Sequence, residues 1–172
     1  MKPKKDLTQG SISKNLLWLA LPVVGGMFMQ NLFILVDTFF VAKLGSDAIA
    51  AIAASFPAFF IIIALASGLN VGVSSFVARS IGAKKYPLVN SIAENGLILG
   101  AVLGILVTVI GLLSGTLIVN LMGVTESVGS LMNQYISWIY IGSFTFFLGH
   151  AANGVLHGEG DTKTPMKGFI LG

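Results

Sequence analysis

The chain has 172 residues, of which 55% are hydrophobic and only 10% are charged. An ordinary soluble domain carries about 25% charged residues, so these charges are too few to cover a water-soluble globule. The absence of cysteine excludes disulfides, thiolate metal sites and cysteine nucleophiles. The net charge of +3 comes from short basic runs between apolar stretches, which is typical of membrane topology rather than of nucleic-acid binding.

Four long stretches of the chain contain no Asp, Glu, Lys or Arg: 15–36, 48–78, 95–125 and 127–158. Each exceeds the roughly 20 residues that cross a hydrocarbon core about 30 Å thick. We therefore expect an all-α, polytopic membrane protein with four transmembrane helices. In chain order, the pattern predicts helices over 15–42, 49–79, 92–121 and 131–157, a cytoplasmic loop over 158–166 and the start of a fifth helix over 167–172.

The basic residues predict the orientation of these helices. Nine of the ten Lys and Arg residues lie in the N-terminal segment 2–14, in 79–85 and in 163–167, whereas Lys43 alone occupies the first loop. Positive residues concentrate on the cytoplasmic side of a membrane. We therefore expect a multi-pass cell-membrane protein whose N-terminus and even-numbered loops are cytoplasmic.

Small residues and prolines predict how the helices pack and bend. The third predicted helix carries a glycine stripe, formed by Gly96, Gly100, Gly104, Gly111 and Gly115. Such spacing lets helix backbones approach closely within a membrane, although glycine is also common in membrane helices in general. Pro22 and Pro57 each remove a backbone hydrogen bond, so bends are expected in the first and second helices.

Motifs of soluble enzymes are absent. The run 158–164 contains a Lys-Thr pair, but Thr162 rather than glycine precedes Lys163, so the run is no phosphate-binding loop. His150 and His157 share one helical face without a third ligand nearby, so no metal site is predicted there. Nothing in the sequence calls for a cofactor, and we predict that the protein is not an enzyme.

Asp37 is the exceptional residue, because it follows a long apolar run. A carboxylate near the middle of a bilayer costs about 2.5–3.5 kcal/mol on insertion scales, so an intramembrane acid is a functional candidate. Gln30 lies two helical turns earlier on the same face, and Asn153 shares the face of the two histidines. The alternative is that Asp37 lies at the outer interface.

Three stretches resemble the multidrug and toxic compound extrusion (MATE) transporters, in particular their archaeal and DinF-like branch. The most specific is the loop motif Gly158-Glu-Gly160-Asp161-Thr162-Lys163-Thr164-Pro165-Met166. The run 36–40 followed by 43–45 resembles the end of the family's first helix, and 81–83 resembles its second cytoplasmic loop. The matches occur in family order along nearly the whole chain.

The resemblance implies a cation-coupled antiporter with two six-helix lobes, which exports lipophilic, often cationic drugs or toxic compounds by alternating access. It places the coupling ion, H⁺ or Na⁺, at Asp37, and it assigns Gln30 and Asn153 to the substrate cavity. It assigns Pro22 to a helix bend. His157 departs from the family pattern, which commonly has arginine or glutamine before the loop motif.

The chain ends where the fifth helix begins, so we expect the N-terminal part of a longer transporter. The expected partners are the lipid bilayer, a small substrate and further helices of the same protein, with no nucleic acid. One alternative is a lipid-linked saccharide flippase, which the lack of Lys and Arg within the spans disfavours. The other is a small structural or assembly membrane protein that acts as an oligomer.

Overall fold

A computed structural model describes residues 11–171, and every element in that range is an α-helix. The helices are α1 (Ile12–Ala42), α2 (Ser46–Gly82), α3 (Tyr86–Met122), α4 (Glu126–Gly158) and α5 (Lys163–Leu171). The first four are long and apolar enough to cross a membrane. The predicted all-α, membrane-spanning fold class is thus confirmed.

The helices extend further than the sequence analysis predicted, and the connections are correspondingly short. α3 contains 37 residues, about 55 Å at 1.5 Å per residue, so its ends project beyond the hydrocarbon core. The predicted loop over 158–166 is too long, because α5 already begins at Lys163. The carboxylate of Asp161 accepts a hydrogen bond from the Thr164 backbone N–H at 3.1 Å and so supports an earlier start of that helix.

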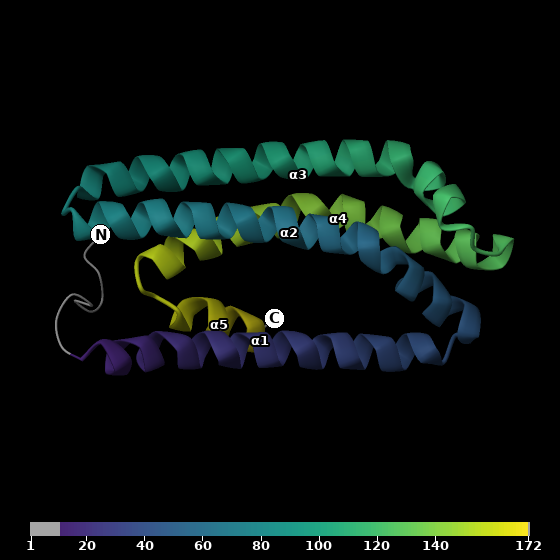
Figure 1. The fold of residues 1–172 in the computed structure, drawn as a ribbon, viewed down its shortest axis with the longest axis horizontal. Coiled ribbons are helices and arrows are strands. Elements are labelled where there is room, and N and C mark those ends of the chain that lie inside the picture. Colours follow the sequence, from purple (N-terminus) through teal and green to yellow (C-terminus); the bar gives the residue numbers. More distant parts are fainter. Residues whose placement is uncertain (1–10, 172) are drawn as a thin grey trace.

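Consecutive long helices run antiparallel, and their connections alternate between the two ends of the molecule (Figure 1). The connections 83–85 and 159–162 lie at the end where α1 begins. The connections 43–45 and 123–125 lie at the opposite end. This arrangement matches the alternation that the basic residues predict, while the assignment of one end to the cytoplasm stays a prediction.

α4 is the central helix of a three-helix bundle, and both α2 and α3 pack along it. The predicted glycine stripe of α3 is buried; Gly96 faces Val73 of α2, and the other four glycines face α4. A Cβ atom at Gly104 would lie 2.7 Å from the Cα atom of Phe144, and one at Gly111 would overlap the Tyr140 ring. Larger residues at these positions would therefore push α3 away from α4.

Hydroxyl groups join α3 and α4 at the middle of the bundle. The Thr108 hydroxyl donates to the backbone carbonyl of Tyr140 at 2.7 Å and lies 3.0 Å from the Ser143 hydroxyl. Ser143 is almost fully buried. Interhelical hydrogen bonds of this kind contribute about 0.6–1.7 kcal/mol each within membranes, so they add to the close glycine packing.

α1 lies apart from this bundle (Figure 1). Within residues 11–171 it contacts α2 and α5 but has no close backbone approach to α4. In the view of Figure 1, α2 curves in the half that contains Pro57, as predicted, whereas α1 runs straight past Pro22. The bend at Pro22 is therefore not seen in this view and stays a prediction.

Candidate functional site

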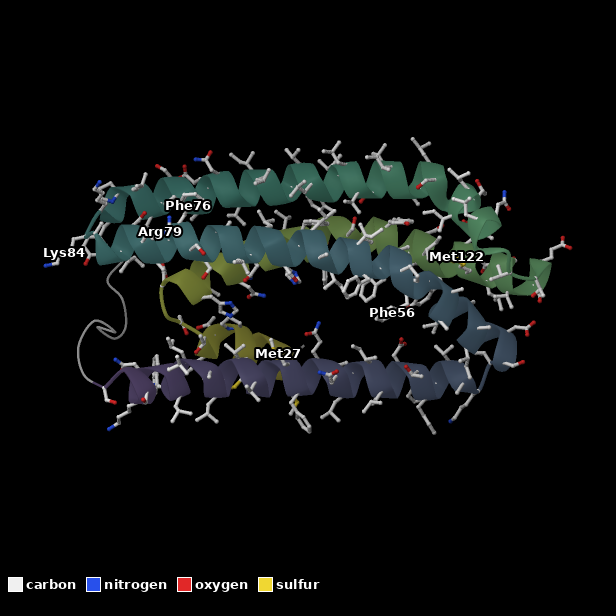
Figure 2. All side chains as sticks on the ribbon, in the orientation of Figure 1. Met27, Phe56, Phe76, Arg79, Lys84 and Met122 are labelled. Carbon is white, nitrogen blue, oxygen red and sulfur yellow. The ribbon has the colours of Figure 1, made fainter. Side chains whose placement is uncertain are left out.

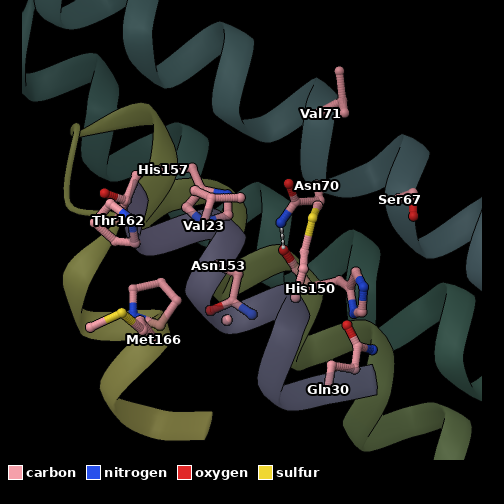
Figure 3. A pocket seen from close by; sticks show the side chains of 14 residues that line it. Val23, Gln30, Ser67, Asn70, Val71, His150, Asn153, His157, Thr162 and Met166 are labelled. Carbon is pink, nitrogen blue, oxygen red and sulfur yellow. Dashed lines mark hydrogen bonds between the residues drawn. The ribbon is translucent and has the colours of Figure 1, made fainter. Parts of the chain in front are cut away.

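A pocket of about 280 Å³ lies between α1, α2, α4 and the beginning of α5 (Figure 3). Most of its surface is apolar, but polar side chains reach it from three helices and from the α4–α5 connection. The polar lining residues are Gln30, Ser67, Asn70, His150, Asn153, His157 and Thr162. The pocket therefore combines an apolar wall with hydrogen-bonding groups, as small-molecule sites commonly do.

α1 forms one wall of the pocket. Pro22 and Gly26 are buried there, and Met27 and Gln30 complete the wall. These positions follow one another at spacings of one, three and four residues, which places them on one helical face. Pro22 and Gln30, predicted as the bend and as a cavity residue, therefore face the same pocket.

α2 and α4 form the opposite wall, and a glycine allows them to approach closely. A Cβ atom at Gly154 would lie 2.8 Å from the backbone oxygen of Asn70. At this crossing the Asn70 side-chain amide donates to the backbone carbonyl of His150 at 2.9 Å, as Figure 3 shows. The bond fixes the Asn70 amide while its oxygen stays available to a bound molecule.

The imidazole of His150 is held by its own helix. Its Nδ1 lies 3.0 Å from the backbone oxygen of Phe146. The imidazole and the Phe146 ring are 4.3 Å apart between their centroids. Because a carbonyl oxygen can only accept, this contact requires the tautomer with hydrogen on Nδ1. In the neutral imidazole the other ring nitrogen, Nε2, is then a hydrogen-bond acceptor, and His150 lines the pocket.

The loop motif closes the end of the pocket next to α5. Gly160 has a φ of 79°, a left-handed conformation that favours glycine, and the Asp161 carboxylate binds both the backbone N–H and the hydroxyl of Thr164. This turn carries Thr162 into the pocket lining. The Thr162 hydroxyl is buried without a hydrogen-bond partner among the described residues.

Two contacts attach α1 to this loop. The Lys163 ammonium lies 5.0 Å from the centroid of the Trp18 ring, a distance suited to a cation–π interaction. A Cβ atom at Gly25 would lie 3.3 Å from the sulfur of Met166. The loop motif thus has a structural role in joining α4, α5 and α1, and Thr162 and Pro165 additionally line the pocket.

The pocket is electrically neutral when its histidines are neutral. No residue that lines it, within the described part of the chain, is Asp, Glu, Lys or Arg. The lining offers amide, hydroxyl and imidazole groups that can donate and accept hydrogen bonds. Such a site can bind an apolar compound that carries a few polar atoms.

Asp37 does not lie in this pocket. It is exposed on α1 and lies within electrostatic range of Tyr135 on α4. Midway between Lys14 and Lys43, the helix centre falls near residue 28, so Asp37 is about 13 Å from the centre at 1.5 Å per residue. On this spacing the carboxylate would lie toward the edge of a hydrocarbon core with a half-thickness of about 15 Å, and the depth of Asp37 in the membrane stays a prediction.

The structure thus brings together Pro22, Gln30, Asn153, Thr162 and Pro165 but leaves Asp37 two turns away along α1. Sequence analysis missed Asn70 and Ser67. Their signal was present, because polar side chains stand out within the charge-free run 48–78. In residues 11–171 no group of three His, Cys, Asp or Glu residues could hold a metal ion.

Four membrane-length helices, three of which line a pocket with polar side chains, define part of a polytopic membrane protein. The MatE family model matches residues 22–172. The chain therefore belongs to the MatE family, the multidrug and toxic compound extrusion proteins that the motifs resemble.

Curated relatives support this membership. The chain is 32% identical over 165 residues to the FAD transporter of Shewanella oneidensis, and this match covers 96% of the present chain and 36% of that protein. It is 30% identical over 164 residues to the probable multidrug resistance protein NorM of Thermotoga maritima, covering 95% of this chain and 35% of the relative. The chain thus spans about a third of the length of these relatives.

Solved structures agree with this result. A MOP superfamily transporter from Pyrococcus furiosus, whose description refers to reverse polarity of its binding pocket, matches with a TM-score of 0.91 and 35% identity. This match covers 96% of the present chain and 36% of that one. A MATE protein in complex with MaD5 matches with a TM-score of 0.92 and 34% identity, covering 99% and 39% of the two chains.

Proposed function

We propose that this chain is the N-terminal part of a cation-coupled antiporter that exports lipophilic, often cationic compounds by alternating access. The observation that carries the proposal is the pocket into which α1 places Gln30 and α4 places Asn153. Binding sites near the middle of the membrane, between helices that can change position, are the general arrangement of secondary transporters. The remaining helices would come from a longer protein of the length of its relatives.

In this proposal Asp37 binds the coupling H⁺ or Na⁺. It is the only acidic residue within α1, and it is exposed rather than held by neighbouring side chains. A charge moved across the membrane potential is worth about 2.3 kcal/mol per 100 mV. Because α1 has few contacts with the bundle, an energy of this size can shift its position relative to α4.

The neutral lining supports a second substrate class for the same pocket. A cation is best bound next to a carboxylate, and the described lining residues include none. Amides and imidazoles instead match the hydrogen-bonding edge of a heteroaromatic compound. The chain is 32% identical to the FAD transporter of Shewanella oneidensis, so the flavin ring is a reasonable heteroaromatic group to test beside lipophilic cations. Riboflavin is the form that suits the neutral lining, because it lacks the phosphates that call for basic partners.

The orientation and surroundings belong to the same proposal. We place the protein in the cell membrane, with the N-terminus and the connections 83–85 and 159–162 in the cytoplasm. The support is the concentration of Lys and Arg in the segments 2–14, 79–85 and 163–167; the described basic residues of these segments lie at that end of the molecule. The absence of Lys and Arg from the pocket lining argues against the flippase alternative, because a lipid-linked pyrophosphate calls for basic partners.

The test is transport by the complete protein in liposomes, with pH and Na⁺ gradients imposed separately. Asp37→Asn keeps the size and some hydrogen bonding of the side chain but cannot ionise. We expect it to abolish gradient-driven export while leaving folding and substrate binding nearly intact. Asp47→Asn is the matched control, because Asp47 is an exposed acid at the start of α2, and it should transport at the wild-type rate.

Wild-type export by Asp37→Asn would contradict the coupling role and return Asp37 to an interfacial residue. Loss of export in both variants would show that the effect does not depend on the site. Transport by residues 1–172 alone would instead support the alternative of a small protein that completes itself as an oligomer. Separate assays with a lipophilic cation and with riboflavin distinguish the two substrate classes.

A further inference from the structure

A second cavity lies between α2 and α3, apart from the pocket that α1, α2, α4 and α5 line. It is a groove of about 480 Å³ whose lining is mostly apolar. Its floor is the contact between Val73 and Gly96, where a Cβ atom on the glycine would lie 2.9 Å from the valine side chain. Gly68 and Gly72 leave the groove open, because no atom lies within 4 Å of a Cβ atom placed at either position.

The groove runs along the half of α2 that ends at the 83–85 connection. Its lining residues on α2 extend from Gly68 to Phe76, which is about 12 Å at 1.5 Å per residue. One leaflet of the hydrocarbon core is about 15 Å deep. The groove therefore has the direction and the length of an acyl chain in one leaflet of the bilayer.

A basic cluster, formed by Arg79, Lys84 and Lys85, lies beyond the Phe76 end of this groove, with Arg79 nearest to it and the two lysines in the 83–85 connection. Arg79 follows the lining residue Phe76 by one helical turn, and Figure 2 shows both beside the gap between α2 and α3, with Lys84 at the end of the same helix pair. All three basic residues are exposed. The one acidic residue between positions 79 and 95 is Glu94, which does not line the groove.

We propose that this groove is a binding site for an anionic phospholipid, with one acyl chain between α2 and α3 and the headgroup phosphate on the basic cluster. An apolar channel of leaflet depth that ends at three cations is complementary to such a lipid in both shape and charge. Basic pockets between transmembrane helices bind anionic headgroups for the same reason. The site does not depend on the transport activity proposed above.

The test is lipid retention by the complete protein, measured by native mass spectrometry in mild detergent. The probes are phosphatidylglycerol and phosphatidylcholine with identical acyl chains, added in separate titrations. We expect the wild type to bind phosphatidylglycerol at least tenfold more tightly. Replacing Arg79, Lys84 and Lys85 together by Gln should remove that preference, because each basic residue near a membrane surface contributes about fivefold to anionic-lipid binding.

Two further variants separate the headgroup site from the groove. Lys43→Gln neutralises the basic residue at the opposite end of the molecule, and it should leave the preference unchanged. Gly72→Leu fills the groove and should weaken binding of both lipids about equally. Its matched control is Gly142→Leu on α4, where a Cβ atom also meets nothing within 4 Å, and this variant should bind as the wild type does.

Equal retention of the two lipids by the wild type would overturn the proposal, as would an unchanged preference in the triple Gln variant. If another segment of the complete protein occupies the groove, the wild type will retain neither lipid there and Gly72→Leu will destabilise the protein. If Gly72→Leu fails to fold for any reason, the comparison of the triple Gln variant with Lys43→Gln decides the outcome.

Discussion

The bundle of α2, α3 and α4 and the separate helix α1 are built from similarly apolar sequence, but the bundle helices pack closely against one another whereas α1 has few contacts. α4 buries residues along its entire length against two neighbours, whereas Pro22 and Gly26 are the only fully buried residues among the described positions of α1. α1 is nevertheless the more hydropathic of the two helices. Within a membrane, hydropathy therefore does not indicate which helix forms the core.

What distinguishes the bundle is the placement of small and hydroxyl residues. Lipid tails are as apolar as leucine, so association depends on close van der Waals contact and on interhelical hydrogen bonds. The glycine stripe of α3 and the Thr108–Ser143 pair supply both in the bundle. α1 has fewer contacts with its neighbours than the bundle helices have with one another, and the side-chain contacts at Trp18 and Gly25 lie in its first half. This leaves α1 freer to change position.

The largest expected effect comes from breaking the bundle at Gly104. In Gly104→Val the new side chain meets the backbone of Phe144, which cannot move aside as a flexible side chain would. Overpacking of this kind costs about 1–3 kcal/mol, and we expect the upper end of that range. The measurement is the thermal unfolding midpoint of the complete protein in detergent.

Gly142→Val is the control for this change. Gly142 lies on α4, the helix that packs against Gly104, but no atom lies within 4 Å of a Cβ atom placed at position 142. We expect its midpoint to stay near the wild-type value. Equal midpoints for the two variants would show that α3 does not approach α4 as closely as described.

A smaller effect is expected when the hydroxyl link between α3 and α4 is removed. Thr108→Val keeps the branched shape but loses the bonds to Tyr140 and Ser143, at a cost of about 0.6–1.7 kcal/mol. Ser114→Ala serves as the comparison, because the Ser114 hydroxyl donates to a carbonyl of its own helix at 2.7 Å. If Ser114→Ala lowers the unfolding midpoint as much as Thr108→Val does, the interhelical bond contributes nothing.

The smallest effect is expected at the attachment of α1. The interaction of Lys163 with Trp18 should be worth about 0.5–1 kcal/mol, as for other exposed cation–π pairs. A double-mutant cycle with Lys163→Gln and Trp18→Leu measures this coupling through unfolding midpoints. Strictly additive effects of the two changes would mean that α1 is held by Met166 and the chain connection without help from this pair.

The sequence was sufficient to predict the elements that depend on composition and spacing. Long charge-free runs set the number of long helices, and the four-residue glycine spacing identified the face of α3 that is buried. Gln30 and Asn153 were predicted as cavity residues, and both line the described pocket. The family resemblance assigned both residues to a substrate cavity, and their role in binding a substrate stays a prediction.

Features that depend on distant contacts were not predictable in this way. The role of Asn70 depends on a crossing of α2 and α4 that brings residues 80 positions apart into contact. The early start of α5 depends on the orientation of the Asp161 side chain. The separation of Asp37 from the pocket follows from where the pocket lining ends along α1, at Gln30, which depends on the packing of the other helices.

α1 runs straight in the view of Figure 1 and has few contacts with the bundle, so it can move as one body. Seven residues turn a helix to within about 20° of two complete revolutions, so Gln30 and Asp37 point in nearly the same direction from its axis. Any rotation of the whole of α1 about that axis turns both side chains through the same angle. The Asp37 carboxylate and the Gln30 amide are therefore coupled through the helix backbone, although the two side chains do not need to touch.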